Sequence, residues 1–128
     1  SDSVLSKTKR GEESEILAIS WFRARGFSVV ARRLRTPFAE VDLLLWRRSS
    51  REWLMVEVKS SLWPDGVAAG LSRKQKARLW RASLWLQDEI SHNLQSCSRH
   101  EDVHLGLVLA VREEGPMRRV GFRILPIF

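Results

Sequence analysis

The spacing of apolar residues between Glu12 and Arg25 predicts an amphipathic helix. Positions i, i+3, i+4 and i+7 share one face of a helix, and here they are occupied by Glu15, Ala18, Ile19 and Phe22. Gly26 follows and suits the left-handed position just after a helix. Glu15 stands at the head of an apolar stripe, which leaves two readings open: a first-turn acid that interacts with the helix dipole, or a functional carboxylate.

Three extended segments follow this helix. Runs rich in apolar and β-branched residues predict strands over Phe27–Leu34, Ala39–Trp46 and Glu52–Lys59. Arg47 to Arg51 separates the last two and is short enough for a hairpin turn. We therefore expect these two strands to pair antiparallel around Ser49 and Ser50.

The second half of the chain predicts one helix and two more strands. Ser72 and Gln75 have the spacing of a capping box, which opens a basic helix to about Ile90. Before it, Trp63 to Gly66 has turn composition, and after it Asn93 to Asp102 is a polar loop. The strands run over Val103–Val111 and Val120–Phe128, the second at a sheet edge because Pro126 has no N–H to donate.

The order of these elements indicates the fold class. Helix, three strands, helix and two strands predict an α/β domain, with a mixed central sheet of about five strands flanked by helices. A length of 128 residues suits one domain over residues 1–128.

Charge adds a class of partner. The chain has 22 Lys and Arg against 15 Asp and Glu, a net charge of +7, which favours nucleic acid or another polyanion. Basic residues cluster at the start of the second helix, at Arg73, Lys74, Lys76 and Arg78, and in the first strand up to Arg35. No apolar run is long enough to span a membrane, and the single cysteine favours a reducing compartment. We expect a cytoplasmic protein.

The hairpin places acidic residues opposite each other. With the turn centred on Ser49 and Ser50, Trp46 opposes Trp53, Asp42 opposes Glu57 and Glu40 opposes Lys59. Opposed Cβ atoms lie roughly 4.5 to 5.5 Å apart, so two carboxylates would repel each other unless a cation lies between them. Oxygen ligands favour Mg²⁺, Mn²⁺ or Ca²⁺ over zinc. The alternative is a hairpin whose charges face solvent and pair with nearby arginines.

A cation held by Asp42 and Glu57 suggests phosphodiester hydrolysis. Such an ion polarises a phosphoryl oxygen and lowers the pKa of a bound water. Lys59 would then stabilise negative charge that develops on the phosphate oxygens. The basic composition independently favours a phosphate-containing substrate.

These residues resemble a known family. "AEVDLLLW", then "MVEVKSS", preceded by "GEESEILAISWFRARGF" and followed by "LSRKQKARL", look like the YraN family of predicted nucleases. That family belongs to the restriction-endonuclease-like PD-(D/E)XK superfamily, whose members include Holliday junction resolvases. The resemblance covers residues 9–111, and the combined order of motifs is more specific than any single one.

The resemblance implies roles for individual residues. Asp42 and Glu57 would bind Mg²⁺ or Mn²⁺, and Lys59 would be the third catalytic member. Glu15 matches an acid on the first helix that helps at the metal site in related nucleases. Glu40 matches the acid before the motif aspartate, and Lys74 matches the lysine that opens the second helix. The chain departs from the family at three positions, Ala39, Ser61 and Gly106, where glycine, arginine and aspartate are usual.

The resemblance thus implies a Mg²⁺-dependent endonuclease acting on DNA, branched or otherwise structured. A homodimer would suit symmetric cleavage of a junction. One rival is a nucleic-acid-binding module with a degenerate nuclease site, in which Arg73, Lys74, Lys76, Arg78 and Arg35 bind phosphate without turnover. Another is a protein-interaction domain that uses Trp63, Trp85 and the last strand.

Overall fold

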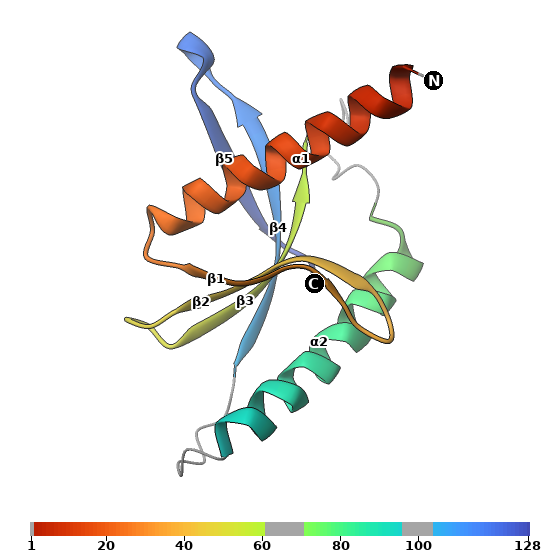
Figure 1. Ribbon diagram of the computed structural model, residues 1–128, viewed down its shortest axis with the longest axis vertical. Coiled ribbons are helices and arrows are strands. Elements are labelled where there is room, and N and C mark those ends of the chain that lie inside the picture. Colours follow the sequence, from red (N-terminus) through yellow and green to blue (C-terminus); the bar gives the residue numbers. More distant parts are fainter. Residues whose placement is uncertain (1, 61–70, 96–103) are drawn as a thin grey trace.

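The computed structural model describes residues 2–60, 71–95 and 104–128. Its elements are, in chain order, α1 (Asp2–Arg23), β1 (Ser28–Arg35), β2 (Glu40–Arg47), β3 (Glu52–Lys59), α2 (Arg73–Gln95), β4 (Leu105–Glu114), a short 3₁₀ helix (Pro116–Arg118) and β5 (Val120–Pro126). The order of helices and strands and the α/β fold class are as the sequence predicts (Figure 1).

One mixed sheet contains all five strands in the order β1-β2-β3-β4-β5. The pairs β1–β2, β2–β3 and β4–β5 are antiparallel, whereas β3 and β4 are parallel. A parallel pair needs a crossover connection, and α2 lies in the chain between these two strands. β5 is an edge strand, as the proline near its end predicts.

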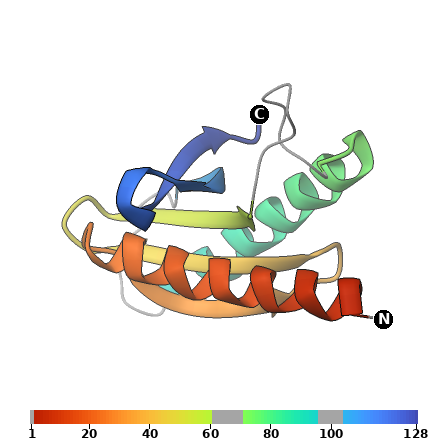
Figure 2. The same cartoon turned by 90° about the horizontal axis from the view of Figure 1, so that it is seen from above.

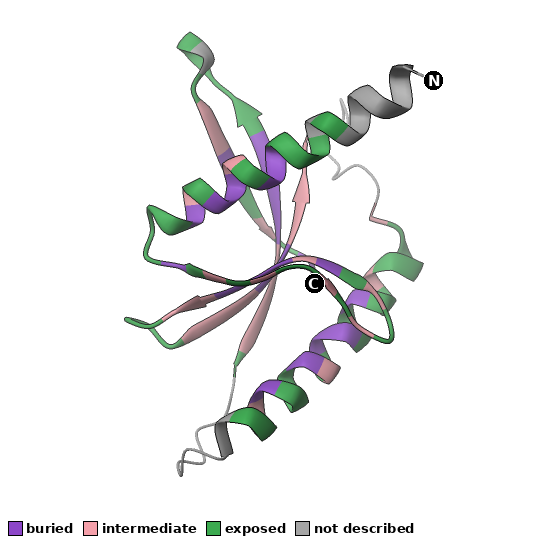
Figure 3. Cartoon of the chain, viewed as in Figure 1, coloured by how far each residue is buried: buried purple, intermediate pink, exposed green. Residues whose placement is uncertain are grey.

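The two helices cover opposite faces of the sheet (Figure 2). On one face, α1 packs Ala18, Ile19 and Phe22 against a core that includes Leu43, Leu45, Val56 and Ala110. On the other, α2 packs Leu79, Ala82, Leu86 and Ile90 against a core that includes Leu44, Met55 and Leu109. The buried residues therefore follow the inward side of each helix and the middle of the sheet (Figure 3).

The helix α1 begins at Asp2 and not at Glu12, so the predicted start is wrong by ten residues. No apolar stripe marks this N-terminal extension, which is why the periodicity missed it. The other end is as expected. Gly26 has φ of 90°, its N–H donates to the carbonyl of Arg23, and the Phe27 N–H donates to that of Phe22. These two bonds form a Schellman motif.

The helix α2 starts with the predicted capping box. The Ser72 N–H donates to Gln75 Oε1 at 2.8 Å, and the Gln75 N–H donates to Ser72 Oγ at 3.2 Å. The helix continues to Gln95, so the prediction of a loop from Asn93 is wrong for its first three residues. The predicted turn at Trp63 and the rest of that loop lie outside the described residues.

The β2–β3 register is the one predicted from the hairpin. Trp46 pairs with Trp53 and Leu44 with Met55, and the two indole rings lie 4.9 Å apart between centroids. The hairpin and the helix faces together fix which side of the sheet each later residue occupies. No helix among the described residues is both long and apolar enough to cross a membrane.

Candidate functional site

Beyond Leu43 and Val56, hydrogen bonds between side chains and backbone N–H groups connect β2 and β3. The backbone pairs of the ladder run from Arg47↔Glu52 to Leu43↔Val56. Next along the strands, the Asp42 N–H donates to Glu57 Oε1 at 3.2 Å, and the Val58 N–H donates to Asp42 Oδ2 at 2.8 Å. Each carboxyl group therefore uses one oxygen to hold the neighbouring strand, which fixes both side chains in place.

Both acids are unusually hard to ionise. Burial, followed by the charge of Asp42, raises the pKa of Glu57 to about 8. Burial also raises the pKa of Asp42, opposed by the hydrogen bond from the Val58 N–H and the charge of Lys59. Since the pKa of Glu57 lies near 8, the pair retains about one proton at neutral pH.

Glu57 and Lys59 line a pocket on the α2 side of the sheet. Its volume is about 200 Å³, and its lining consists of Phe38, Ala39, Glu40, Glu57, Lys59, Leu71, Gln75, Arg78 and Leu79. The residues come from the β1–β2 turn, the ends of β2 and β3, the first turns of α2 and Leu71 just before that helix. Positive charge from Lys59 and Arg78 thus faces the carboxyl group of Glu57, and the N-terminus of α2 further favours an anionic ligand.

Asp42 is not among the lining residues of this pocket, but its hydrogen bonds tie it to β3 directly at Glu57. The carboxyl oxygens of Asp42 and Glu57 are the hard donors that Mg²⁺ and Mn²⁺ prefer. A cation between the two groups would replace the retained proton and remove their repulsion, so the residues fit the ion. In residues 2–60, 71–95 and 104–128, no three His, Cys, Asp or Glu side chains form a metal cage. Mg²⁺ typically takes one or two carboxylates and completes its shell with water or substrate phosphate.

Glu15 lies apart from the pocket. It sits on α1, which covers the opposite face of the sheet, and its side chain is only 8% exposed. Its carboxylate binds Arg32, with Nε and Nη2 both at 3.2 Å, and Arg33, with Nε at 3.6 Å. Its charge nonetheless contributes to the raised pKa of Asp42. The structure thus pairs Glu15 with arginines and leaves its predicted role at the metal site a proposal.

A backbone irregularity explains how two consecutive arginines reach one carboxylate. Neighbouring residues of a strand normally point to opposite faces. Arg33 has φ of 48°, in the left-handed region, and the paired positions skip from Arg32↔Leu43 to Leu34↔Val41. The alternation therefore breaks directly opposite Asp42, and both arginine side chains lie on the α1 face.

The predicted basic residues of α2 divide between two flanks of the helix. Arg78 lines the pocket, and Lys74, four residues earlier, shares its flank. Trp80 instead packs on Phe128, with ring centroids 5.3 Å apart. Lys76 and Arg73 lie four and seven residues before Trp80 and share that second flank. Of these four residues, Arg78 lines the pocket with Glu57, and Lys74 shares its flank of the helix.

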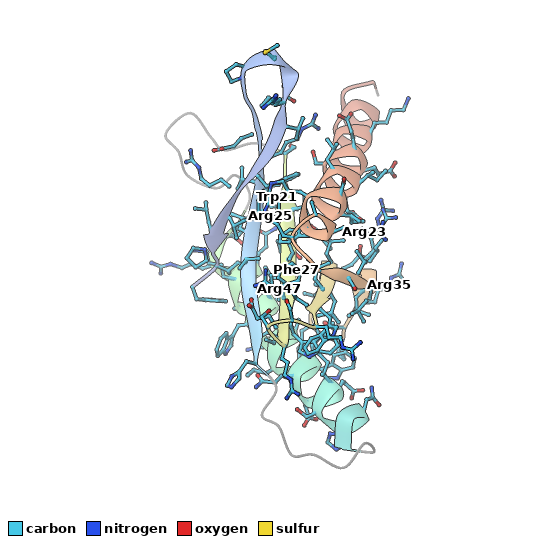
Figure 4. All side chains as sticks on the ribbon, turned by 90° about the vertical axis from the view of Figure 1, so that its left-hand side faces the viewer. Trp21, Arg23, Arg25, Phe27, Arg35 and Arg47 are labelled. Carbon is cyan, nitrogen blue, oxygen red and sulfur yellow. The ribbon has the colours of Figure 1, made fainter. Side chains whose placement is uncertain are left out.

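Arg35 stands at the end of β1, and its side chain is 91% exposed. Its Nε lies 4.0 Å from Glu40, a residue of the pocket wall. Figure 4 shows Arg35 at the periphery, well away from Trp21, Arg25, Phe27 and Arg47. In that group, Arg25 stacks over Trp21 and Arg47 over Phe27, with 3.4 and 4.5 Å to the ring centroids. These two arginines are structural, whereas Arg35 extends toward solvent.

Sequence reasoning missed a buried arginine that fixes α1. Arg112 on β4 is buried, and it donates to Glu13 Oε1 at 2.9 Å and to Ser14 Oγ at 3.2 Å. Its Nη2 also lies 3.1 Å from Glu114. With Glu15 held by β1 and Glu13 held by β4, ion pairs fix α1 from both sides. In the sequence, this contact could have been suspected from a lone arginine at the end of the apolar run "LVLAV".

Phe38 and Gln75 are pocket residues that sequence reasoning also missed. Of the three departures from the family pattern, Ala39 lines the pocket, and Ser61 lies outside the described residues. Gly106 pairs with Leu54, which packs on the α1 side. A Cβ there would lie 2.9 Å from Leu54 Cδ2. Glycine in place of the usual aspartate at position 106 therefore does not alter the face of the sheet that carries the pocket.

Comparison with known proteins gives the family. A sequence model described as "Uncharacterised protein family UPF0102" matches residues 14–105, a range that contains Asp42, Glu57 and Lys59. A UPF0102 protein of Parvibaculum lavamentivorans is 39% identical over 88 residues, which are 69% of this chain and 65% of the relative. One of Shewanella oneidensis is 38% identical over 88 residues, 67% of this chain and 73% of the relative.

A third relative, from Nitrobacter winogradskyi, is 34% identical over 83 residues, 64% of this chain and 69% of its own length. The chain thus spans slightly less than two thirds of the Parvibaculum relative, 65% of its length. The match extends from α1 to the start of β4 and includes every residue of the pocket. The chain therefore belongs to protein family UPF0102, the YraN family of PD-(D/E)XK-like nuclease type, as its motifs predict.

Proposed function

We propose that this chain is a metal-dependent nuclease that hydrolyses DNA phosphodiesters, with branched or otherwise structured DNA as its substrate. The observation that supports this best is geometric. Asp42 and Glu57 are hydrogen-bonded to each other's strand, and Glu57 shares one pocket with Lys59 and Arg78. A glutamate, a lysine and an arginine in one pocket, with a second acid hydrogen-bonded to the strand that carries the glutamate, suit phosphoryl chemistry.

Asp42 and Glu57 would hold Mg²⁺ or Mn²⁺. When bound, such an ion supplies Lewis acidity at a phosphoryl oxygen and a water of lowered pKa. The protein contributes rigidity, because each carboxyl group has one oxygen fixed by a backbone N–H of the neighbouring strand. Fixed ligands keep the cation position constant relative to the pocket.

Lys59 and Arg78 would bind the phosphodiester. Lys59 is on the same strand as Glu57, two residues later, so both side chains point to the α2 face. Arg78 faces them from α2. A phosphate between them would be contacted from the sheet and from the helix, and its charge would be stabilised as it grows during hydrolysis.

DNA longer than one nucleotide would extend along the flank of α2 that carries Lys74 and Arg78 and toward Arg35. Lys74 and Arg35 are exposed, as phosphate-binding residues need to be. The net charge of +7 supports a polyanionic partner. These contacts carry no sequence information, so the shape of the DNA would decide what binds.

One observation favours a second function, that of a nucleic-acid-binding module without turnover. Each carboxyl group already accepts a hydrogen bond from a backbone N–H at one oxygen, and the raised pKa of Glu57 keeps its proton at neutral pH. A site satisfied in this way is stable without a cation. The module would bind DNA in a salt-dependent manner and would not cut it.

Cleavage assays with Mg²⁺ and Mn²⁺ separate the two functions. Wild type and Asp42→Asn are titrated with each ion on duplex, single-stranded and four-way-junction DNA, and circular dichroism verifies the fold. Asn retains an acceptor for the Val58 N–H, so the fold should survive. Cleavage by wild type that Asp42→Asn loses supports the nuclease. DNA binding without cleavage by either protein supports the module, and equal cleavage by both contradicts the site.

A further inference from the structure

The turn between β1 and β2 presents an aromatic ring at the edge of the pocket. Thr36 Oγ1 accepts hydrogen bonds from the N–H groups of Phe38, at 3.2 Å, and Ala39, at 3.0 Å, and donates to the Ala39 carbonyl at 2.6 Å. The Thr36 N–H donates to the same carbonyl at 3.0 Å. Pro37 restricts the backbone further. This small turn is therefore rigid, and it fixes the position of Phe38.

Phe38 is 42% exposed and lines the pocket together with Glu57, Lys59 and Arg78. Other aromatic rings pack on each other, as in the pairs Trp46–Trp53 and Trp80–Phe128. Within the described part of the chain, the ring of Phe38 joins none of these pairs. A rigid turn that places an unstacked ring beside phosphate-binding groups suits a ligand that has both a flat apolar part and a phosphate.

The size of the pocket indicates which part of that ligand enters. A volume of about 200 Å³ is below the ~300 to 1,000 Å³ of sites that enclose a drug-sized molecule. A phosphodiester group fits beside Lys59 and Arg78, but a whole nucleotide does not. The attached base must lie outside, at the edge where Phe38 is exposed.

We propose that Phe38 is a stacking platform for an unpaired nucleobase next to the phosphodiester that enters the pocket. This inference rests on the proposed function and deepens it, because it names the substrate class: DNA with an unstacked nucleotide beside the site of cleavage. In intact duplex both faces of each base are covered by its neighbours, so only a bulged, frayed or junction nucleotide can lie on the ring.

The test uses the Asp42→Asn background without divalent ions, where no cleavage occurs. Binding is measured to a duplex with one unpaired 2-aminopurine and to the fully paired duplex of the same sequence. Phe38→Ala should weaken binding to the first by about 10-fold, the scale of one lost base–aromatic stack, and change the second by less than about 2-fold. Stacking on Phe38 should quench the fluorescence of 2-aminopurine. In the complex with Phe38→Ala, this fluorescence should therefore stay high.

Two control variants make the result specific. Phe38→Trp keeps a ring and should retain both affinity and quenching. Phe128→Ala removes another exposed ring, 63% exposed and stacked on Trp80 on the other flank of α2, and should bind both DNAs as the parent does. Thermal melting verifies that each variant is folded. Equal binding of the unpaired DNA by Phe38→Ala and parent, or an equal loss on both DNAs, overturns the inference.

The same proteins distinguish failure of the inference from failure of the proposed function. Suppose that the wild type cuts DNA with Mn²⁺ and that Phe38→Ala, with Asp42 intact, keeps the same preference between unpaired and paired DNA. The nuclease function is then supported and the stacking role of Phe38 is contradicted. If Phe38-dependent quenching occurs but the wild type does not cut, the platform stands and the nuclease falls. If the parent binds neither DNA, both fall.

Discussion

The backbone N–H of Asp42 donates a hydrogen bond to Oε1 of Glu57 over 3.2 Å, so one acid of the candidate site holds the other by its main chain. The Asp42 carboxylate in turn accepts a bond from the strand that carries Glu57, at the Val58 N–H. This reciprocal arrangement continues the β2–β3 ladder with side chains where the backbone pairs end. It also explains how the fold tolerates two adjacent buried acids.

The stability of the metal-free protein should fall as pH rises. Since the pKa of Glu57 is raised from 4.5 to about 8, the proton that the folded state retains favours folding below pH 4.5, and this contribution is lost as pH rises through about 8. The expected slope is at most about 1.4 kcal/mol per pH unit within that window. Urea unfolding in EDTA at several pH values measures it.

Glu57→Gln is the matched control for this pH effect. Its side chain keeps Oε1 as an acceptor for the Asp42 N–H but cannot ionise, so its stability should depend much less on pH. A variant with the same slope as wild type between pH 5 and 8 would show that Glu57 is not the group responsible.

Lys59→Met should separate catalysis from cation binding. Methionine keeps the length of the side chain and removes a charge beside the developing phosphate charge, so cleavage should fall about 100- to 1,000-fold. Cation affinity should be kept or slightly raised, because Lys59 repels a divalent ion. Initial rates and calorimetry measure both. Lys76→Met, on the other flank of α2, serves as control, and a Lys59→Met enzyme of wild-type rate would contradict the role.

Arg78→Ala should reduce the salt dependence of DNA binding. Loss of one phosphate contact lowers the slope of log affinity against log salt by about 0.9. Arg48→Ala removes the same charge from the exposed β2–β3 turn, at the opposite end of these strands from the pocket, and should leave the slope nearly unchanged. Fluorescence anisotropy over a range of salt concentrations measures the slopes. Equal slopes for the two variants would remove Arg78 from the interface.

Arg112→Ala should destabilise the fold by about 1 to 3 kcal/mol, because the buried Ser14 hydroxyl loses its partner, whereas Glu13 and Glu114 are more than half exposed. Arg112 is buried and holds Glu13 and Ser14 of α1. Arg123→Ala breaks an exposed pair with Glu113, 2.7 Å apart, and should cost less than about 1 kcal/mol. Urea denaturation compares them. Similar losses would mean that Arg112 does not anchor α1.

Much of the site could be predicted because it depends on local rules. A symmetric hairpin and strand alternation predict that Asp42 lies opposite Glu57 and that Lys59 shares the face of Glu57. The two acids are hydrogen-bonded to each other's strand, and Glu57 and Lys59 line one pocket. The capping box and Gly26 likewise act within a few residues of their own helix ends. These features need no knowledge of distant parts of the chain.

The parts that the sequence did not predict depend on contacts between distant residues. Arg33 adopts a left-handed conformation that arginine does not favour on its own, and this conformation lets both Arg32 and Arg33 bind Glu15. Arg112 lies 98 residues from Ser14 in the chain. Phe38 was missed because an apolar residue after proline in a turn gives no sign of whether it will be buried or exposed.

The most direct test is whether a divalent cation displaces the proton that Asp42 and Glu57 retain at neutral pH. Mn²⁺ is titrated into wild type, Asp42→Asn and Glu57→Gln at pH 7 by calorimetry, in two buffers with different enthalpies of ionisation. Since cation binding needs ionised carboxylates, the wild type should bind one ion and release about one proton. Both variants should lose this site. Binding without proton release, or equal binding by all three proteins, would contradict the central claim.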